Sequence, residues 1–264
     1  MMTPSVEDID RFLSYIFHDG TGKSTPFLRR LTFTLLHPVV ALGSLHYVLR
    51  SPIVNVTVPP SEKSRARWMY DRQRPWRLQG FISSYIELPT PIEHFWRGQA
   101  RQNLRKSTAR ARAAGFRVKT VSPSEIVEVT SQVFTDSGWK QFEIENAHRN
   151  LRAFMDGVIC VGVFDDTSRA VAFCLGTQAG NIVRNVWAYT SLRGTVRWLC
   201  FSGYVEEVNA RGAKFIIESP PWAFTGGNDV FAGNLGFKPA RIRSNRVSLR
   251  PFTLAQEHAL RRAS

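Results

Sequence analysis

The sequence has 264 residues, of which 43% are hydrophobic and 12% aromatic, so it can bury a sizeable core and is not a disordered tail. This length fits one large domain or two modest ones. Its 35 Lys and Arg against 21 Asp and Glu give a net charge of +14, which favours a polyanionic partner without identifying it.

Residues 1–80 are predicted to form a helical N-terminal extension and a basic linker. The opening MMTPSVEDID lacks the basic and then apolar order of a secretory signal, so we expect a cytoplasmic protein. Apolar residues at helical spacing predict a helix between Thr3 and Phe17. The linker, residues 59–80, is basic and aromatic. Its aromatic side chains are expected either to anchor the loop to the core or to stack on bases.

The segment Leu31–Leu49 is nearly long enough to span a bilayer. It is interrupted by His37, Pro38 and Gly43, and these residues favour a buried helical hairpin or an interfacial segment over a membrane span. Membrane contact is not expected from the sequence, although the interfacial alternative leaves it open.

The next segment, residues 90–115, predicts a capped helix with a cationic face. Thr90 is the expected cap, Pro91 suits the first helical position, Glu93 suits the third, and Gly115 ends the helix. Its arginines recur at helical spacing and are predicted to share one face. Such a face is either a solvated surface or a site for a nucleotide, a polyphosphate or a nucleic-acid backbone. The candidate polyanion-binding residues are Arg97, Arg101, Arg105 and Arg112.

The elements around this helix predict a mixed α/β domain. Strands are expected at residues 83–88 and 116–121, followed by a helix capped at Ser122 and Glu125. An antiparallel meander is predicted for residues 158–164, 170–177 and 182–189. After it come a helix over 195–210 closed by Gly212, a strand over 214–218, a short helix over 228–235 and final strands through Leu249.

The three cysteines, Cys160, Cys174 and Cys200, lie in apolar runs and match no metal spacing. They are predicted to be small buried side chains in a reducing compartment, and no metal cofactor is expected.

Two stretches carry a resemblance to a known family. SYIELPTPIEHFWRGQARQNLRKSTARARAAGFRV places a Leu-Pro pair before a helix rich in Arg, and FAGNLGFKPARI contains an LGF turn. Together with the order of elements, they resemble the GNAT acyltransferase fold and most closely its Fem-like branch. The resemblance covers about Ser83 to Leu249. It implies an α+β mixed sheet, with residues 81–250 as the acyltransferase domain and 251–264 as a C-terminal tail.

What the resemblance implies is direct transfer of an acetyl, other acyl or aminoacyl group to an amine-bearing acceptor. The donor would be acetyl-CoA, another acyl-CoA or an aminoacyl-tRNA, and it would lie where two strands splay near Trp187–Thr190. Arg193, Gly194 and Thr195 match part of the family's pyrophosphate-binding loop. The partial match leaves open a tRNA donor, an atypical CoA site or a domain without catalysis. The candidate donor-binding residues are Ala188, Thr190, Ser191, Arg193, Gly194, Thr195, Arg197, Asn228 and Asn234.

Direct transfer needs a base for the amine and an acid for the leaving group. Glu218, at the end of a predicted strand, is the candidate base, although a strand-end Glu is as often an ion-pair partner. Tyr189 is the candidate acid, although its hydroxyl could simply satisfy a buried hydrogen bond. The rival hypothesis is a protein that binds or modifies tRNA or another nucleic acid and uses the same scaffold without acyl transfer. It rests on the arginine-rich helix and the loop at residues 65–77.

Overall fold

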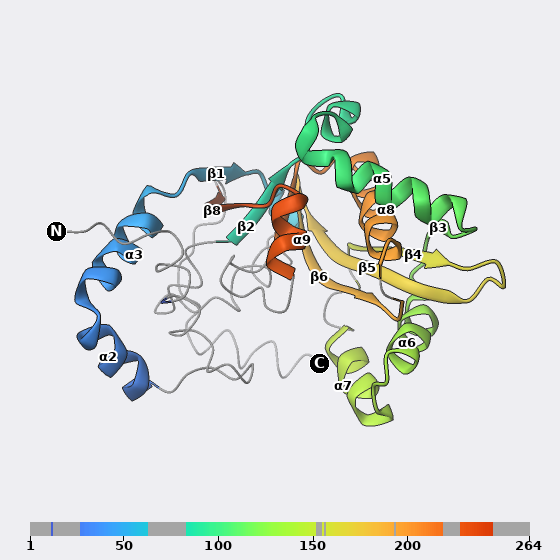
Figure 1. Ribbon diagram of the computed structural model, residues 1–264, viewed down its shortest axis with the longest axis horizontal. Helices are drawn as coiled ribbons and strands as arrows, with labels where there is room; N and C mark the ends of the chain where they lie inside the picture. Colours follow the sequence, from blue (N-terminus) through green and yellow to red (C-terminus); the bar gives the residue numbers. More distant parts are fainter. Residues whose placement is uncertain are drawn as a thin grey trace.

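The computed structural model describes residues 12, 27–62, 83–151, 155, 157–192, 194–218 and 228–244. Within them one eight-stranded mixed sheet carries helices on both faces (Figure 1). The strands are β1 (Ile53–Val56), β2 (Ser83–Glu87), β3 (Arg117–Thr120), β4 (Val158–Phe164), β5 (Ala170–Ala179), β6 (Ile182–Thr190), β7 (Phe215–Glu218) and β8 (Lys238–Ser244). The α-helices are α2 (Phe27–Leu36), α3 (Pro38–Arg50), α5 (Gln102–Ala113), α6 (Ile126–Asp136), α7 (Gln141–Leu151), α8 (Val196–Ala210) and α9 (Asn228–Asn234).

The strand order is β1-β8-β2-β7-β6-β5-β4-β3. Strands β4 to β6 form the predicted antiparallel meander, β3 pairs antiparallel with β4 at its outer side, and β7 pairs with β6 in parallel. Strand β2 lies between β7 and β8 and is antiparallel to both. The expected mixed α/β class is confirmed, and the elements follow the order that the GNAT resemblance implies.

Two groups of buried side chains lie on opposite faces of the sheet. Helices α5 and α8 cover one face, where Leu104, Leu199 and Tyr204 pack against β4, β5 and β7. Helices α6 and α7 cover the other, where Phe134 and Leu151 pack against β4 and β5. All but the last residue of β4 is buried, which explains why a continuous apolar run predicted that strand. The three cysteines are buried and free, as predicted.

The extension contributes a strand that the sequence did not predict. Strand β1 pairs in parallel with β8 and becomes the edge of the sheet. The segment after β1 is fixed to the β5–β6 turn, because Thr57 N donates to Asn181 Oδ1 at 2.8 Å. Gly180 in that turn has φ +58°, and a methyl group there would overlap Thr57 O. The extension is thus tied to the domain by backbone pairing as well as by side chains.

The predicted helix over residues 90–115 is broken. Short 3₁₀ turns occupy Ile92–Trp96 and Gln99–Arg101, and the α-helix α5 begins only at Gln102. Gly98, with φ +87°, lies between the two turns, and Thr90 makes no capping bond. The predicted stop is confirmed: Gly115 has φ +89°, Phe116 N donates to Ala111 O, and Gly115 N donates to Arg112 O.

The predicted buried helical hairpin at residues 31–49 is wrong. Helices α2 and α3 meet at His37, but Leu35, Leu36 and Leu42 are about two-thirds exposed. No helix in the described part of the chain is long and apolar enough to cross a membrane. The exposed leucines are compatible with the second alternative for this segment, an interfacial one.

Helix α7 was not predicted, because residues 139–154 are mostly polar. Its buried residues Ile144, Ala147 and Leu151 nevertheless have helical spacing. Other predictions lie outside the described residues. These are the first helix apart from the buried Phe12, most of the 59–80 linker with its 65–77 loop, the final strands beyond residue 244, and the 251–264 tail.

Candidate active site

The sheet opens between β6 and β7. Their parallel pairing begins at Ile182↔Phe215 and ends at Arg184↔Ile217. In the β5–β6 pair, Gly176 lies opposite Asn185 and Leu175 opposite Trp187, so Val186 is an extra residue on β6. Such a bulge bends a strand and increases its twist. Residues 187–190 therefore pair with β5 alone, in the place where the sequence predicted a splay.

Glu218 lies at the end of β7, beside this opening, and is half-buried. Asn185 Nδ2 donates a hydrogen bond to Glu218 Oε1. Asn185 is 7% exposed, and its own Oδ1 has no hydrogen-bond partner among the described residues. The structure thus places a carboxylate, held by a buried amide, where β6 and β7 diverge.

Two further polar side chains are electrostatically coupled to Glu218. Burial lowers the pKa of Arg197, and the negative charge of the Glu218 carboxylate opposes that effect. Burial is also the main cause of the raised pKa of Tyr204, with Cys174 and Glu218 adding to it. The Tyr204 hydroxyl is buried and has no hydrogen-bond partner among the described residues. The side chains around Glu218 are therefore largely removed from water, and the charge of Glu218 affects the pKa values of Arg197 and Tyr204.

Sequence reasoning missed Asn185 and Tyr204. Asn185 is a buried residue of VRNVW on β6, and Tyr204 is a buried residue of FSGYV on α8. A buried polar side chain in such a stretch needs a partner, and that need is the signal that could have identified them.

The structure does not place the Tyr189 side chain beside Glu218. Its ring packs in T-shaped contacts with Phe134 at 5.1 Å and Trp139 at 5.3 Å, in the core group beneath α6 and α7. Asn185 and Tyr204, which accompany Glu218, lie on the α8 side of the sheet, since Tyr204 belongs to the other core group. Burial raises the pKa of Tyr189. Its hydroxyl is therefore held on the face of the sheet opposite to Glu218.

A cavity of about 580 Å³ lies at the first turn of α8, between the β6–α8 loop, α9 and the end of α6. It is lined by five of the predicted donor-binding residues, Thr190, Ser191, Gly194, Arg197 and Asn234. The Arg197 guanidinium lies 3.6 Å from the centre of the Phe231 ring, which also lines the cavity. Aromatic stacking holds this cation at the cavity wall.

The other four predicted donor-binding residues do not line this cavity or are not among the residues that the structure describes. Thr195 precedes α8 and makes no side-chain cap, so the first N–H groups of that helix are not covered by it. Ala188 is exposed on β6, opposite Cys174. Asn228 begins α9, and Arg193 is not described.

The four candidate polyanion-binding arginines do not share a face, which corrects the sequence prediction. Arg97 lies before α5 in extended backbone. Arg101 stacks over Phe95 at 4.4 Å and donates to Asn234 O at 3.0 Å, and burial lowers its pKa. Arg105 donates to Gly98 O at 3.0 Å and to Trp96 O. Arg101 and Arg105 thus bind backbone carbonyls around the broken helix.

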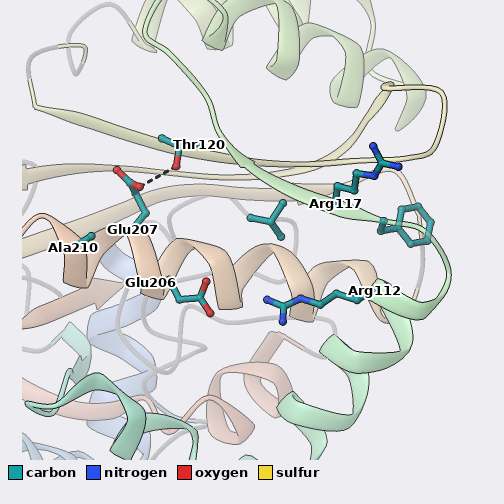
Figure 2. A pocket seen from close by; sticks show the side chains of 8 residues that line it. Arg112, Arg117, Thr120, Glu206, Glu207 and Ala210 are labelled. Carbon is teal, nitrogen blue, oxygen red and sulfur yellow. Dashed lines mark hydrogen bonds between the residues drawn. The ribbon is translucent and has the colours of Figure 1, made fainter.

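Arg112, the fourth arginine, lines a separate cavity of about 590 Å³ between α5, β3 and α8 (Figure 2). Figure 2 shows the Arg112 guanidinium and the Glu206 carboxylate directed toward each other. Glu207 lines the same cavity and accepts a hydrogen bond from Thr120 at 2.9 Å. Arg112 and Arg117 share this cavity with two carboxylates, so its cations are balanced by negative charge and it does not favour a polyanion.

Replacing Arg101 should test its structural role. We expect Arg101→Ala to lower the free energy of unfolding by about 1–2 kcal/mol, because the cation–π contact and a carbonyl partner are both lost. Urea unfolding followed by circular dichroism measures the change. The matched control is Arg110→Ala, which removes an exposed arginine of the adjoining helix α5 and should leave the urea midpoint unchanged. Equal midpoints for the two variants would contradict the role given to Arg101.

The described residues contain no group of three or more His, Cys, Asp or Glu side chains arranged to hold a metal ion. No family model and no curated protein matches the sequence. Solved structures do show similarity. FemX is 9% identical, with a TM-score of 0.46 over 61% of this chain and 59% of its own. L-PGS from Bacillus licheniformis is 13% identical, with a TM-score of 0.44 over 64% and 61%.

A tandem GNAT protein from the clavulanic acid biosynthesis pathway is 14% identical, with a TM-score of 0.40 over 60% of this chain and 50% of its own. The chain therefore spans roughly half to three-fifths of the length of these proteins. Similarities of this size identify neither a donor nor an acceptor.

Proposed function

We propose that this protein is an acyltransferase that passes an acyl or aminoacyl group from a CoA thioester or an aminoacyl-tRNA to an amine. One observation carries the proposal: the β6–β7 pairing ends beside Glu218, and Arg197, whose pKa responds to the Glu218 charge, lines a cavity formed by the loop and helix predicted to bind the donor. A strand edge, a carboxylate and a cationic helix start are the parts that direct acyl transfer requires.

The donor would lie along β6 beyond Arg184, where the strand pairs with β5 alone. Peptide-like groups of a pantetheine arm or an aminoacyl ester can pair with such a strand edge. Its phosphates would lie in the cavity at the first turn of α8, near Arg197. Backbone N–H groups and the helix dipole favour an anion at that position.

Glu218 would act as the base. As the amine nitrogen forms its bond to the acyl carbon, Glu218 accepts a proton from that nitrogen. The bond from the acyl carbon to the thioester sulfur or ester oxygen then breaks, and the leaving atom takes up a proton. Asn185 donates to Glu218 Oε1 and so fixes the carboxylate beside the end of the β6–β7 pairing. Tyr189, the acid predicted from the sequence, packs on the opposite face of the sheet and is not positioned to give this proton, so water would supply it.

Ligand binding to the folded protein tests the donor class. At a hundredfold excess over Kd, a CoA thioester should add about 2.7 kcal/mol to the free energy of unfolding and raise the thermal midpoint by roughly 5 °C or more. The measurement is thermal unfolding with acetyl-CoA, longer acyl-CoAs or CoA, at low and moderate salt. A shift that survives moderate salt supports a thioester donor.

An aminoacyl-tRNA should instead show affinity that falls steeply with salt, because phosphate contacts dominate such binding. The net charge of +14 favours this alternative and also the nucleic-acid-binding hypothesis. Comparing charged with uncharged tRNA separates them, since a transferase distinguishes the two. A protein that binds neither thioesters nor aminoacyl-tRNA would contradict the proposed function.

A further inference from the structure

Most of the exposed large apolar side chains of the described residues lie on α2 and α3. Six large apolar side chains there are 44–70% exposed, and Ile53, just after α3, is a seventh. Other exposed large apolar residues of the described part, such as Phe142 on α7, are scattered singly. The six residues, here called the leucine face, are Leu35, Leu36, Val39, Leu42, Leu45 and Leu49.

Helix α3 is oriented with its apolar side outward. Ser44 is 3% exposed and donates to Val40 O at 2.8 Å, while Leu42 and Leu45 on either side of it are exposed. The exposed residues of α3 recur at three- and four-residue spacing, so they form one stripe. Each leucine kept in water forgoes roughly 1.5–3 kcal/mol of burial free energy. A contiguous face of this kind marks an interaction site.

The charge around this face indicates what covers it. In the sequence, residues 27–61 contain three cations, Arg29, Arg30 and Arg50, and no Asp or Glu. Arg50 is exposed at the end of α3, and Arg241 of the adjoining β8 donates to Ser51 O at 3.1 Å. A second copy of the chain would bring like charges together, and a nucleic acid offers no apolar medium. An anionic lipid surface offers both a negative charge and an apolar layer.

We propose that the leucine face binds reversibly to an anionic lipid surface. Helices α2 and α3 have 10 and 13 residues, about 15 and 20 Å long, and they project from one end of the molecule (Figure 1). They would lie in the plane of the interface, with the leucines at the boundary of headgroups and acyl chains and the arginines at the phosphates. This inference is independent of the proposed acyl transfer and departs from the sequence expectation of no membrane contact.

Vesicle sedimentation with the full chain tests the proposal. We expect binding to vesicles of 70% phosphatidylcholine and 30% phosphatidylglycerol that weakens as salt is raised, and little binding to pure phosphatidylcholine. The double variant Leu35→Ser with Leu42→Ser should lower the partition coefficient at least tenfold, because two apolar side chains are lost from the contact. Both residues are about two-thirds exposed, so the fold should persist, which the urea midpoint checks.

Phe142→Ser is the matched control, since Phe142 is 65% exposed on α7 but is not part of the leucine face. It should bind vesicles like the unmodified protein. Three results would each overturn the proposal: no vesicle binding, undiminished binding by the leucine double variant, or equal binding to neutral and anionic vesicles. A fourth contradicting result would come from sedimentation velocity. If the protein self-associates and the leucine double variant abolishes this association, a second copy of the chain covers the face.

Discussion

Glu218→Gln should lower the rate of acyl transfer by about 10²- to 10⁴-fold while leaving donor binding unchanged. A positioned general base contributes an effect of this size, and an amide of the same shape cannot accept the proton from the amine. Asn185 can still contact the new side chain, so the local structure should persist. The measurement is kcat with a saturating donor and an amine acceptor, together with the donor-induced shift of the thermal midpoint.

Two further variants make this result specific. Glu206→Gln makes the same chemical change on the exposed side of α8 and should leave kcat unchanged. Asn185→Ser shortens the amide that holds Glu218 and should lower kcat by about tenfold without changing donor affinity, because Asn185 positions the base and does not touch the proton. Undiminished transfer by Glu218→Gln would remove this carboxylate from the mechanism.

The central strands were predictable because a strand that is buried on both faces consists of consecutive apolar residues. Strand β4 was predicted with its observed bounds, and β5 and β6 were predicted to within two residues. The stops at Gly115 and Gly212 were also predictable, since both have positive φ and end a helix in the way that glycine favours. These signals are local and strong.

The misses came from residues whose conformation is set by distant contacts. Arg101 and Arg105 have the spacing of a cationic helix face, but Phe95 is buried and Arg101 reaches Asn234, more than a hundred residues away. Tertiary packing thus overrode the helical pattern. Helix α7 had a signal that was overlooked: Glu143 accepts a hydrogen bond from Lys140 N at 2.8 Å, which is half of a capping box.

The candidate site was only half predictable for the same reason. A strand end locates Glu218, and the loop before α8 locates much of the cavity. The contact with Asn185 joins residues 33 positions apart, and it depends on the parallel pairing of β6 with β7. No local pattern encodes that pairing, so the amide that orients the carboxylate emerged only from the fold.

Replacing Gly176 tests how tightly the core is packed where the sheet opens. It lies on β5 opposite Asn185, at the bulge that carries β6 away from β7. A methyl group on its Cα would overlap the Tyr204 hydroxyl and come within 2.7 Å of Arg184 O and 3.0 Å of Val183 Cγ1. Tyr204 is fully buried, so its ring cannot swing into solvent to make room.

We therefore expect Gly176→Ala to lower the free energy of unfolding by about 3 kcal/mol, as overpacking of a dense core does. Tyr204→Phe alone should cost little or be stabilising, because the hydroxyl it removes has no hydrogen-bond partner among the described residues. Combined, the two changes should recover about 1–2 kcal/mol, since the Arg184 carbonyl still crowds the methyl group. Urea unfolding measures all three, with Gly233→Ala on α9, where nothing lies within 4 Å, as the tolerated control. Simple additivity of the Gly176 and Tyr204 changes would show that the hydroxyl does not fill the space above Gly176.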